Sequence, residues 1–151
     1  MNQIIISGHG QGGSVAALAA LAVATMFPCQ AYKIKLLTYG SPKLGDTTFV
    51  QYFALKVPLS VRYVTSNSAE GDDIYTTVGT GIDHVGKSIS LTCATFSKRA
   101  STACHIAPEY LHAILVKHEG RQAFVNLRPL ATPSDCNVTC TSTLIIVCSH
   151  L

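Results

Sequence analysis

Glycines near the start of the chain have the spacing of two chemical motifs. Gly8, Gly10 and Gly13 fit Gly-x-Gly-x-x-Gly, a turn whose backbone N–H groups hold a pyrophosphate. Gly8 and Gly12 fit the Gly-x-Ser-x-Gly nucleophile elbow, a strained turn that presents a reactive Ser between a strand and a helix. Gly10 stands at the Ser position of that elbow. The function of the chain depends on which motif this turn is.

A dinucleotide site needs a further residue that this chain lacks. An acidic side chain at the end of the next strand, about 20 residues on, would bind the ribose hydroxyls. No Asp or Glu occurs between Met1 and Gly45. We therefore expect no dinucleotide cofactor, and a dinucleotide-binding fragment is the remote alternative.

The elbow motif predicts an acid and then a His further along the chain. Asp72 and Asp73 follow the third predicted strand, and His105 precedes the last predicted helix. Both positions have the order of a hydrolase triad. Asp73 beside Gly71 also fits a plain turn, and His105 also fits an ordinary surface histidine.

Strands and helices alternate in the sequence, and this order predicts how these side chains are positioned. Apolar, β-branched runs predict strands at 3–7, 32–39, 59–65 and 84–91. Ala-rich or amphipathic runs predict helices at 11–26, 46–55 and 108–117. The alternation predicts an α/β fold with a mostly parallel sheet and helices on both faces. The turns at 8–13 and 40–42 and the loop at 66–81 then share one sheet edge.

The composition excludes several classes of protein. A hydrophobic content of 48% with only 13% charged residues indicates one well-buried domain. A net charge of +3, spread along the chain, does not indicate a nucleic-acid partner. The longest apolar stretch, 15–27, is shorter than the roughly 20 residues of a membrane span, so we predict a buried helix there and no transmembrane segment.

The chain has six cysteines, and none forms a C-x-x-C pair, so we predict no metal site. Cys93 with Cys104, or Cys136 with Cys140, could form disulfides in an oxidising compartment. The glycosylation triplet at 137–139 also favours secretion. No signal peptide is visible before the first predicted strand, so the sequence leaves the compartment open.

Several blocks of the sequence match motifs of one family. Residues 6–14 resemble the elbow Thr-Gly-His-Ser-Leu-Gly-Gly-Ala, and residues 37–46 resemble Thr-Phe-Gly-Ser-Pro-Arg-Val-Gly-Asn. Residues 62–64 with 73–75 resemble Arg-Val-Val followed by Asp-x-Val-Pro, and residues 83–87 resemble His-Val-Gly-x-Glu. Residues 105–112 resemble His-x-x-x-x-Tyr-Leu-His. Together these blocks, from about Ile4 to Asn126, resemble the C-terminal half of a fungal-type (class 3) lipase, an α/β-hydrolase.

The resemblance implies a role for each candidate residue. In the family an elbow Ser attacks an ester carbonyl, a His takes its proton and an Asp orients the His. Carried over, Asp73 is the orienting acid, with Asp72 as the alternative because the loop length differs. His105 is the general base, and the backbone N–H of Gln11 contributes to the oxyanion hole.

Gly10 departs from the family pattern because it has no side chain to act as nucleophile. Without one the covalent route is lost, and residual catalysis would come only from the oxyanion hole and binding. The family's N-terminal half, with its lid and second oxyanion donor, is also missing from the match. We therefore expect an exposed sheet edge, in a fragment, a truncated product or a domain that pairs with another.

The sequence thus predicts a lipase-like partial α/β-hydrolase domain at 1–128 and a C-terminal tail at 129–151, containing a strand near 144–147. By resemblance it is a carboxylic ester (acylglycerol) hydrolase that is inactive because of Gly10. The alternative is a pseudoenzyme that binds lipid or protein. We predict an acyl ester or lipid ligand with contact to a lipid interface, and no cofactor; the oligomeric state is not predicted.

Overall fold

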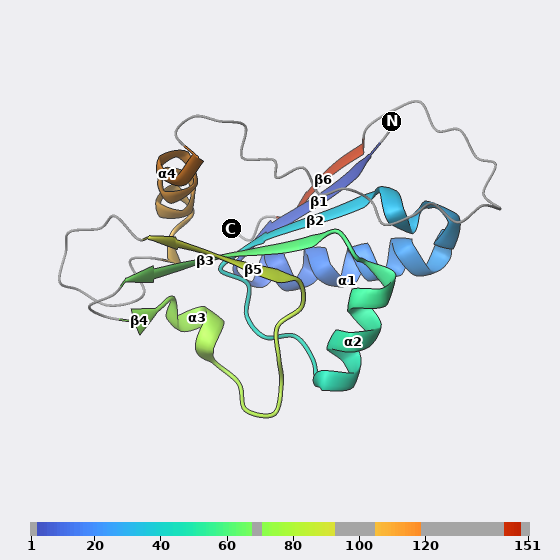
Figure 1. The fold of residues 1–151 in the computed structure, drawn as a ribbon, viewed down its shortest axis with the longest axis horizontal. Coiled ribbons are helices and arrows are strands. Elements are labelled where there is room, and N and C mark those ends of the chain that lie inside the picture. The colour runs from blue at the N-terminus through green and yellow to red at the C-terminus, as the bar shows by residue number, and fades with distance from the viewer. Residues whose placement is uncertain (1–2, 68–70, 93–104, 119–143, 149–151) are drawn as a thin grey trace.

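A computed structural model describes residues 3–67, 71–92, 105–118 and 144–148 of the chain (Figure 1). Its strands are β1 (Ile4–His9), β2 (Ile34–Tyr39), β3 (Ser60–Asn67), β4 (Gly71–Asp72), β5 (Lys87–Thr92) and β6 (Leu144–Cys148). Its helices are α1 (Gln11–Met26), a 3₁₀ segment η1 (Pro28–Lys33), α2 (Thr47–Lys56), α3 (Ile74–Thr77) and α4 (Ala107–His118). Strands and helices alternate, as the sequence predicts.

The strands form one six-stranded sheet in the order β4-β3-β2-β1-β6, with β5 also paired to β3. All pairs are parallel except the short β3–β4 pair. In Figure 1, α4 lies above the sheet and α1 and α2 lie below it. The predicted α/β fold, with a mostly parallel sheet and helices on both faces, is therefore confirmed.

Each face of the sheet has its own hydrophobic core. On the α1 face, Ile6 and Leu36 pack against the buried alanines of α1 and against Phe53 of α2. On the α4 face, Tyr63 and Leu91 pack against Tyr110. Side chains of a strand point alternately to the two faces, so one strand can contribute to both cores. The two cores fix α1 and α4 on opposite sides of the strand ends that carry the site.

β2 and β5 start later in the structure than the sequence predicts. The residues before β2 form the 3₁₀ segment η1, which Pro28 begins. The residues before β5 are turned out of the extended conformation by Gly86, whose φ of 83° lies in the left-handed region. The predicted loop at 66–81 contains the short elements β4 and α3. Asp46 caps the start of α2, because its carboxylate accepts a hydrogen bond from the Phe49 N–H at 2.7 Å.

The strand predicted near the C-terminus is confirmed as β6, which pairs in parallel with β1. β1 therefore has a neighbouring strand on each side, and β6 ends the strand order of the described sheet. The proposed boundary between 128 and 129 lies outside the described residues, as do Cys93, Cys104, the 136–140 cysteine pair and the glycosylation triplet. Cys29, by contrast, is disulfide-bonded. No helix within the described ranges has the length and apolarity needed to cross a membrane.

Candidate active site

The turn between β1 and α1 has the backbone of a tight elbow. Gly10 has φ 57° and ψ −129°, a conformation that L side chains rarely adopt, and its N–H donates to the Tyr39 carbonyl at 2.8 Å. A Cβ at Gly8 would lie 2.1 Å from the Gly12 carbonyl oxygen. Strand and helix backbones approach this closely only because position 8 is glycine. The glycine spacing of the sequence is thus a packing requirement of this turn.

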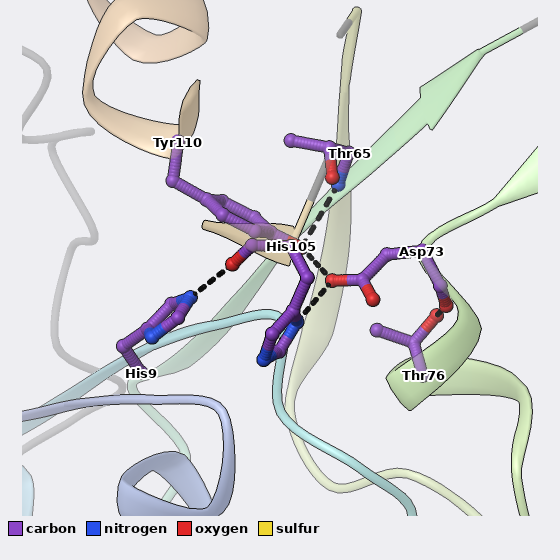
Figure 2. A network of polar contacts seen from close by, with 6 residues as sticks. All are labelled: His9, Thr65, Asp73, Thr76, His105 and Tyr110. Atoms are coloured by element: carbon purple, nitrogen blue, oxygen red, sulfur yellow. Dashed lines mark hydrogen bonds and ion pairs between the residues drawn. The ribbon is translucent and has the colours of Figure 1, made fainter. Parts of the chain in front are cut away.

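His105 and Asp73, the predicted base and acid, are in direct contact. His105 Nδ1 lies 2.7 Å from Asp73 Oδ2 (Figure 2). Asp73 is fully buried, whereas the His105 side chain is 17% exposed. A proton on Nδ1 is donated to the carboxylate, which can only accept it when ionised. Asp72 lies in β4, where its backbone pairs with Ser66. The acid that contacts His105 is therefore Asp73.

Asp73 is held at the start of α3 by hydrogen bonds of its backbone. Its N–H donates to the Thr65 carbonyl of β3 at 3.1 Å. Its own carbonyl accepts from the Thr76 hydroxyl at 2.7 Å. These contacts tie the carboxylate to the C-terminal end of β3, where sheets of this type place their sites.

The Nε2 and Cε1 atoms of the His105 imidazole face the elbow. A Cβ built at Gly10 lies 3.0 Å from His105 Nε2 and 3.4 Å from Cε1. Any side chain at position 10 would therefore begin beside Nε2 of His105. The structure brings three sequence-predicted positions together, in the order nucleophile position, base and acid.

Tyr110 and Gly40 belong to the same cluster, and the sequence analysis assigns neither a role. The Tyr110 hydroxyl donates to Asp73 Oδ2 at 2.8 Å and accepts from the Thr65 N–H at 3.2 Å. A Cβ at Gly40 would lie 2.7 Å from Asp73 Oδ2, 2.9 Å from the Tyr110 hydroxyl and 3.0 Å from His105 Nδ1. In the sequence, the spacing from His105 could have pointed to Tyr110, and the Gly-Ser-Pro block at 40–42 could have pointed to Gly40.

His9 connects the elbow to the segment that carries His105. Its Nε2 lies 2.5 Å from the His105 carbonyl oxygen, and the two ring centroids are 4.7 Å apart (Figure 2). Since a carbonyl only accepts, Nε2 carries the proton and donates it. His9 therefore positions the backbone of His105, which agrees with a structural role for the residue before the nucleophile position.

Gln11 is the first residue of α1, so its N–H lacks a partner within the helix and points from the positive end of the helix dipole. This is the location expected of an oxyanion donor beside position 10. Among the described residues, no three His, Cys, Asp or Glu side chains gather as a metal site would require.

Comparison with known proteins agrees with this fold. Residues 2–70 match the model of the family described as lipase (class 3). This is a class 3 lipase-like α/β-hydrolase domain. The matched part includes the elbow and the 37–46 block and ends before Asp73 and His105, whereas the sequence resemblance extends to Asn126.

Relatives of the lipase-like domain are considerably longer than this chain. A Caenorhabditis elegans lipase is 35% identical over 63 residues, which is 42% of this chain and 18% of that protein. The structure titled Rhizomucor miehei lipase propeptide complex has 25% identity and a TM-score of 0.53, over 59% of this chain and 28% of its own. Lipase II from Rhizopus niveus shares the fold, with 22% identity and a TM-score of 0.50, over 72% and 46% of the two chains. The chain thus spans less than half of each of these relatives.

An apolar cavity of about 210 Å³ lies beside the site of the lipase-like domain. It is lined by His9, Tyr39, Ala107, Tyr110, Leu111 and Ile114. His9 and Tyr110 thus border both the cavity and the polar cluster.

Two histidines of the lipase-like domain should make its stability depend on pH. Burial lowers the pKa of His9 below its ordinary value of 6.5, and burial together with Arg62 lowers the pKa of His84. The unfolded chain then binds more protons than the folded one between the folded pKa values and 6.5. The free energy of unfolding should fall as the pH drops below about 6.5. Urea unfolding at pH 7.5 and 5.5 measures this loss of stability. His84→Gln should reduce the difference in the free energy of unfolding between the two pH values. An unchanged difference in that variant would contradict the contribution of His84.

Tyr110 is expected to stabilise the buried carboxylate. Burial raises the pKa of Tyr110, so its hydroxyl stays protonated and donates to Asp73. Tyr110→Phe removes this hydrogen bond to a charged group and should reduce the free energy of unfolding by about 2 kcal/mol. Tyr52→Phe is the matched control, because Tyr52 is 43% exposed, and it should change stability by less than about 0.5 kcal/mol. Equal effects in urea unfolding would contradict the role of Tyr110.

Proposed function

We propose that the domain is an ester-hydrolase site, acting on acyl esters such as acylglycerols, in which Gly10 replaces the nucleophile and no acyl-enzyme forms. Asp73 orients His105, His105 is the general base, and the Gln11 N–H belongs to the oxyanion hole. One observation carries the proposal. The Cβ position of residue 10 lies 3.0 Å from Nε2 of a histidine whose Nδ1 contacts a buried carboxylate at 2.7 Å.

The geometry fits nucleophilic catalysis better than an incidental histidine. A structural His–Asp pair has no need to face a strained turn at the start of a helix, but a triad requires it. The apolar cavity next to His9 suits an acyl chain, as the lipase family implies. Contact with a lipid interface is consistent with Ile106 and Leu111, which are 50% and 60% exposed beside the site.

Labelling with a fluorophosphonate tests this proposal, because the reagent reacts with an activated Ser. The chain with Gly10 should remain unlabelled, and Gly10→Ser should acquire one adduct at position 10. Adding His105→Ala to Gly10→Ser should abolish the labelling, since the base is then missing. Labelling that does not depend on His105 would contradict the assignment of the site.

The second candidate function is a non-catalytic module that binds lipid or protein. It is favoured by the glycine at the nucleophile position together with the cavity beside it. A non-hydrolysable alkyl ether should then bind, and Ala107→Phe, which fills the cavity, should abolish binding. Val15→Phe is the control, because Val15 is 57% exposed on α1. Absence of binding by the unaltered chain would exclude this function.

A further inference from the structure

A second cavity, with a mostly polar lining, lies on the other face of the sheet. Its volume is about 340 Å³, and it shares no lining residue with the apolar cavity beside His9. Arg62 of β3 and Ser88 of β5 are paired in register, and both line it. Val61 and Ile89, their neighbours along the two strands, belong to the core on the α4 face. The second cavity is therefore on the side where Figure 1 shows α3 below β3 and β5.

The lining of this second cavity combines positive charge with hydroxyl groups. Lys43 and Arg62 supply the charge, and Ser88 and Ser90 of β5 supply hydroxyls. Among the described residues that line the cavity, none is acidic. A cleft lined by charges of one sign concentrates ions of the opposite sign, so this lining favours an anion.

We propose that the second cavity binds the phosphate group of a small soluble ester or of a lipid headgroup. It is a binding site separate from the ester-hydrolase site proposed above. A phosphate monoester carries nearly two negative charges at neutral pH and three strong acceptor oxygens, which match two cations and several hydroxyl donors. The volume of the cavity lies within the range of small-ligand sites, so it has room for more than the phosphate group itself.

Lys43 keeps hydrogen-bond donors for such a ligand. Its Nζ donates to the Gly79 carbonyl at 2.9 Å, and an ammonium group has two further protons to donate. The contact with Gly79 also holds this long side chain in one direction, which reduces the entropy lost on binding. Arg62 makes another interaction in this fold, and its five N–H donors allow it to contact an anion as well.

The walls of the second cavity are held in place by hydrogen bonds of the fold itself. His84 Nε2 donates to the Thr76 carbonyl at 2.7 Å, which fixes α3 against the segment before β5. The Leu44 N–H donates to the Asp83 carbonyl at 2.9 Å, which joins that same segment to the turn after β2. A cavity that is already formed needs little reordering to accept a ligand.

The charges of the two cations also reach His84, which lines the same cavity. Burial lowers the pKa of His84 most, and the charges of Arg62 and Lys43 lower it further. Positive charge therefore acts on this imidazole from β3 and from the turn after β2. An anion bound among these groups would offset the repulsion between them. The imidazole of His84 is thus a reporter inside the cavity.

Isothermal titration calorimetry of the full chain with inorganic phosphate and with glycerol 3-phosphate tests the soluble ligands. Flotation with phosphatidylcholine vesicles, with and without phosphatidic acid, tests the lipid source. Lys43→Gln should weaken binding by about tenfold or more, because it removes a charge-assisted hydrogen bond. Lys43→Arg keeps the charge and should bind more tightly than Lys43→Gln. Ser88→Leu, which narrows the cavity, should also weaken binding.

Lys87→Gln is the matched control, because it removes the same charge from an exposed residue outside the lining. It should change the affinity by less than about twofold. Circular dichroism of each variant verifies folding. Binding of the soluble phosphates would identify a soluble ligand, and binding only to vesicles with phosphatidic acid would identify a lipid headgroup. With either ligand, the NMR resonances of the His84 imidazole should shift on saturation.

Three results would overturn the phosphate site. One is the absence of saturable binding to both soluble phosphates and to the phosphatidic acid vesicles. Another is an equal loss of affinity in Lys43→Gln and Lys87→Gln, which would indicate diffuse attraction to a basic surface. The third is saturation without any shift at His84, which would place the anion elsewhere. None of these measurements involves ester hydrolysis or residue 10, so the proposed function is tested separately.

Discussion

Gly10→Ser is expected to raise the rate of p-nitrophenyl butyrate hydrolysis by about 10³-fold or more, because loss of such a nucleophile costs up to about 10⁶ in kcat. The new hydroxyl is one bond beyond a Cβ that lies 3.0 Å from His105 Nε2. His105 needs to move by only a few tenths of an ångström to make room for that Cβ. The substitution therefore introduces a covalent route into a site whose acid and base are already in contact.

Steady-state kinetics with a burst phase would measure this gain, since an acyl-enzyme accumulates only when a nucleophile is present. Gly10→Ala is the matched control, because it adds the Cβ without the hydroxyl and imposes the same backbone strain. Gly10→Ser with Asp73→Asn should lose the whole of the gain, because loss of the orienting carboxylate costs a triad about 10⁴-fold in kcat. If Gly10→Ser is as slow as Gly10→Ala, residues outside this cluster are required for turnover.

Gly40→Ala is expected to reduce the free energy of unfolding by about 3 kcal/mol. Two effects contribute. Gly40 has a φ of 57°, where a Cβ is strained, and the added methyl would lie within 3.0 Å of Asp73, Tyr110 and His105 at once. The clash would separate hydrogen-bonded groups around a buried carboxylate.

Gly81→Ala separates these two effects. Gly81 has a φ of 72°, but a Cβ there meets no atom within 4 Å. It should therefore show the backbone strain alone, about 1 kcal/mol. Urea unfolding of both variants measures the difference. Equal losses of stability would mean that Gly40 is required only for its backbone conformation, and not for its proximity to the cluster.

Local patterns in the sequence are sufficient to predict the elements in the first half of the fold. The apolar run before the glycines and the Ala-rich run after them correctly predict β1 and α1, because both elements are short-range and strongly patterned. The alternation of strands and helices then predicts where the elbow lies relative to the other strand ends. The sequence does not predict the late start of β5, because that start depends on the left-handed backbone conformation of Gly86. Only the folded chain shows this conformation.

The sequence predicts candidate residues for the site, but not how they pack against one another. Chain order and family motifs predict Asp73 and His105 as acid and base, and leave Asp72 as an alternative because both aspartates lie in one loop of variable length. Neither Tyr110 nor Gly40 could be found by pattern alone, because their roles come from atoms of distant segments meeting at Asp73 Oδ2. The pairing of β6 with β1 is of the same kind, since nothing local in an apolar run specifies its neighbour.

That pairing also has a consequence for how the chain folds. Ile4 pairs with Ile34 across a short crossover, but it also pairs with Leu144, nearly the whole chain away. The entropy lost on closing a loop grows with its length, so the second pairing should form later. During synthesis the elbow strand leaves the ribosome long before this neighbour exists. The pairing of β1 with β6 therefore cannot form until translation reaches Leu144–Cys148.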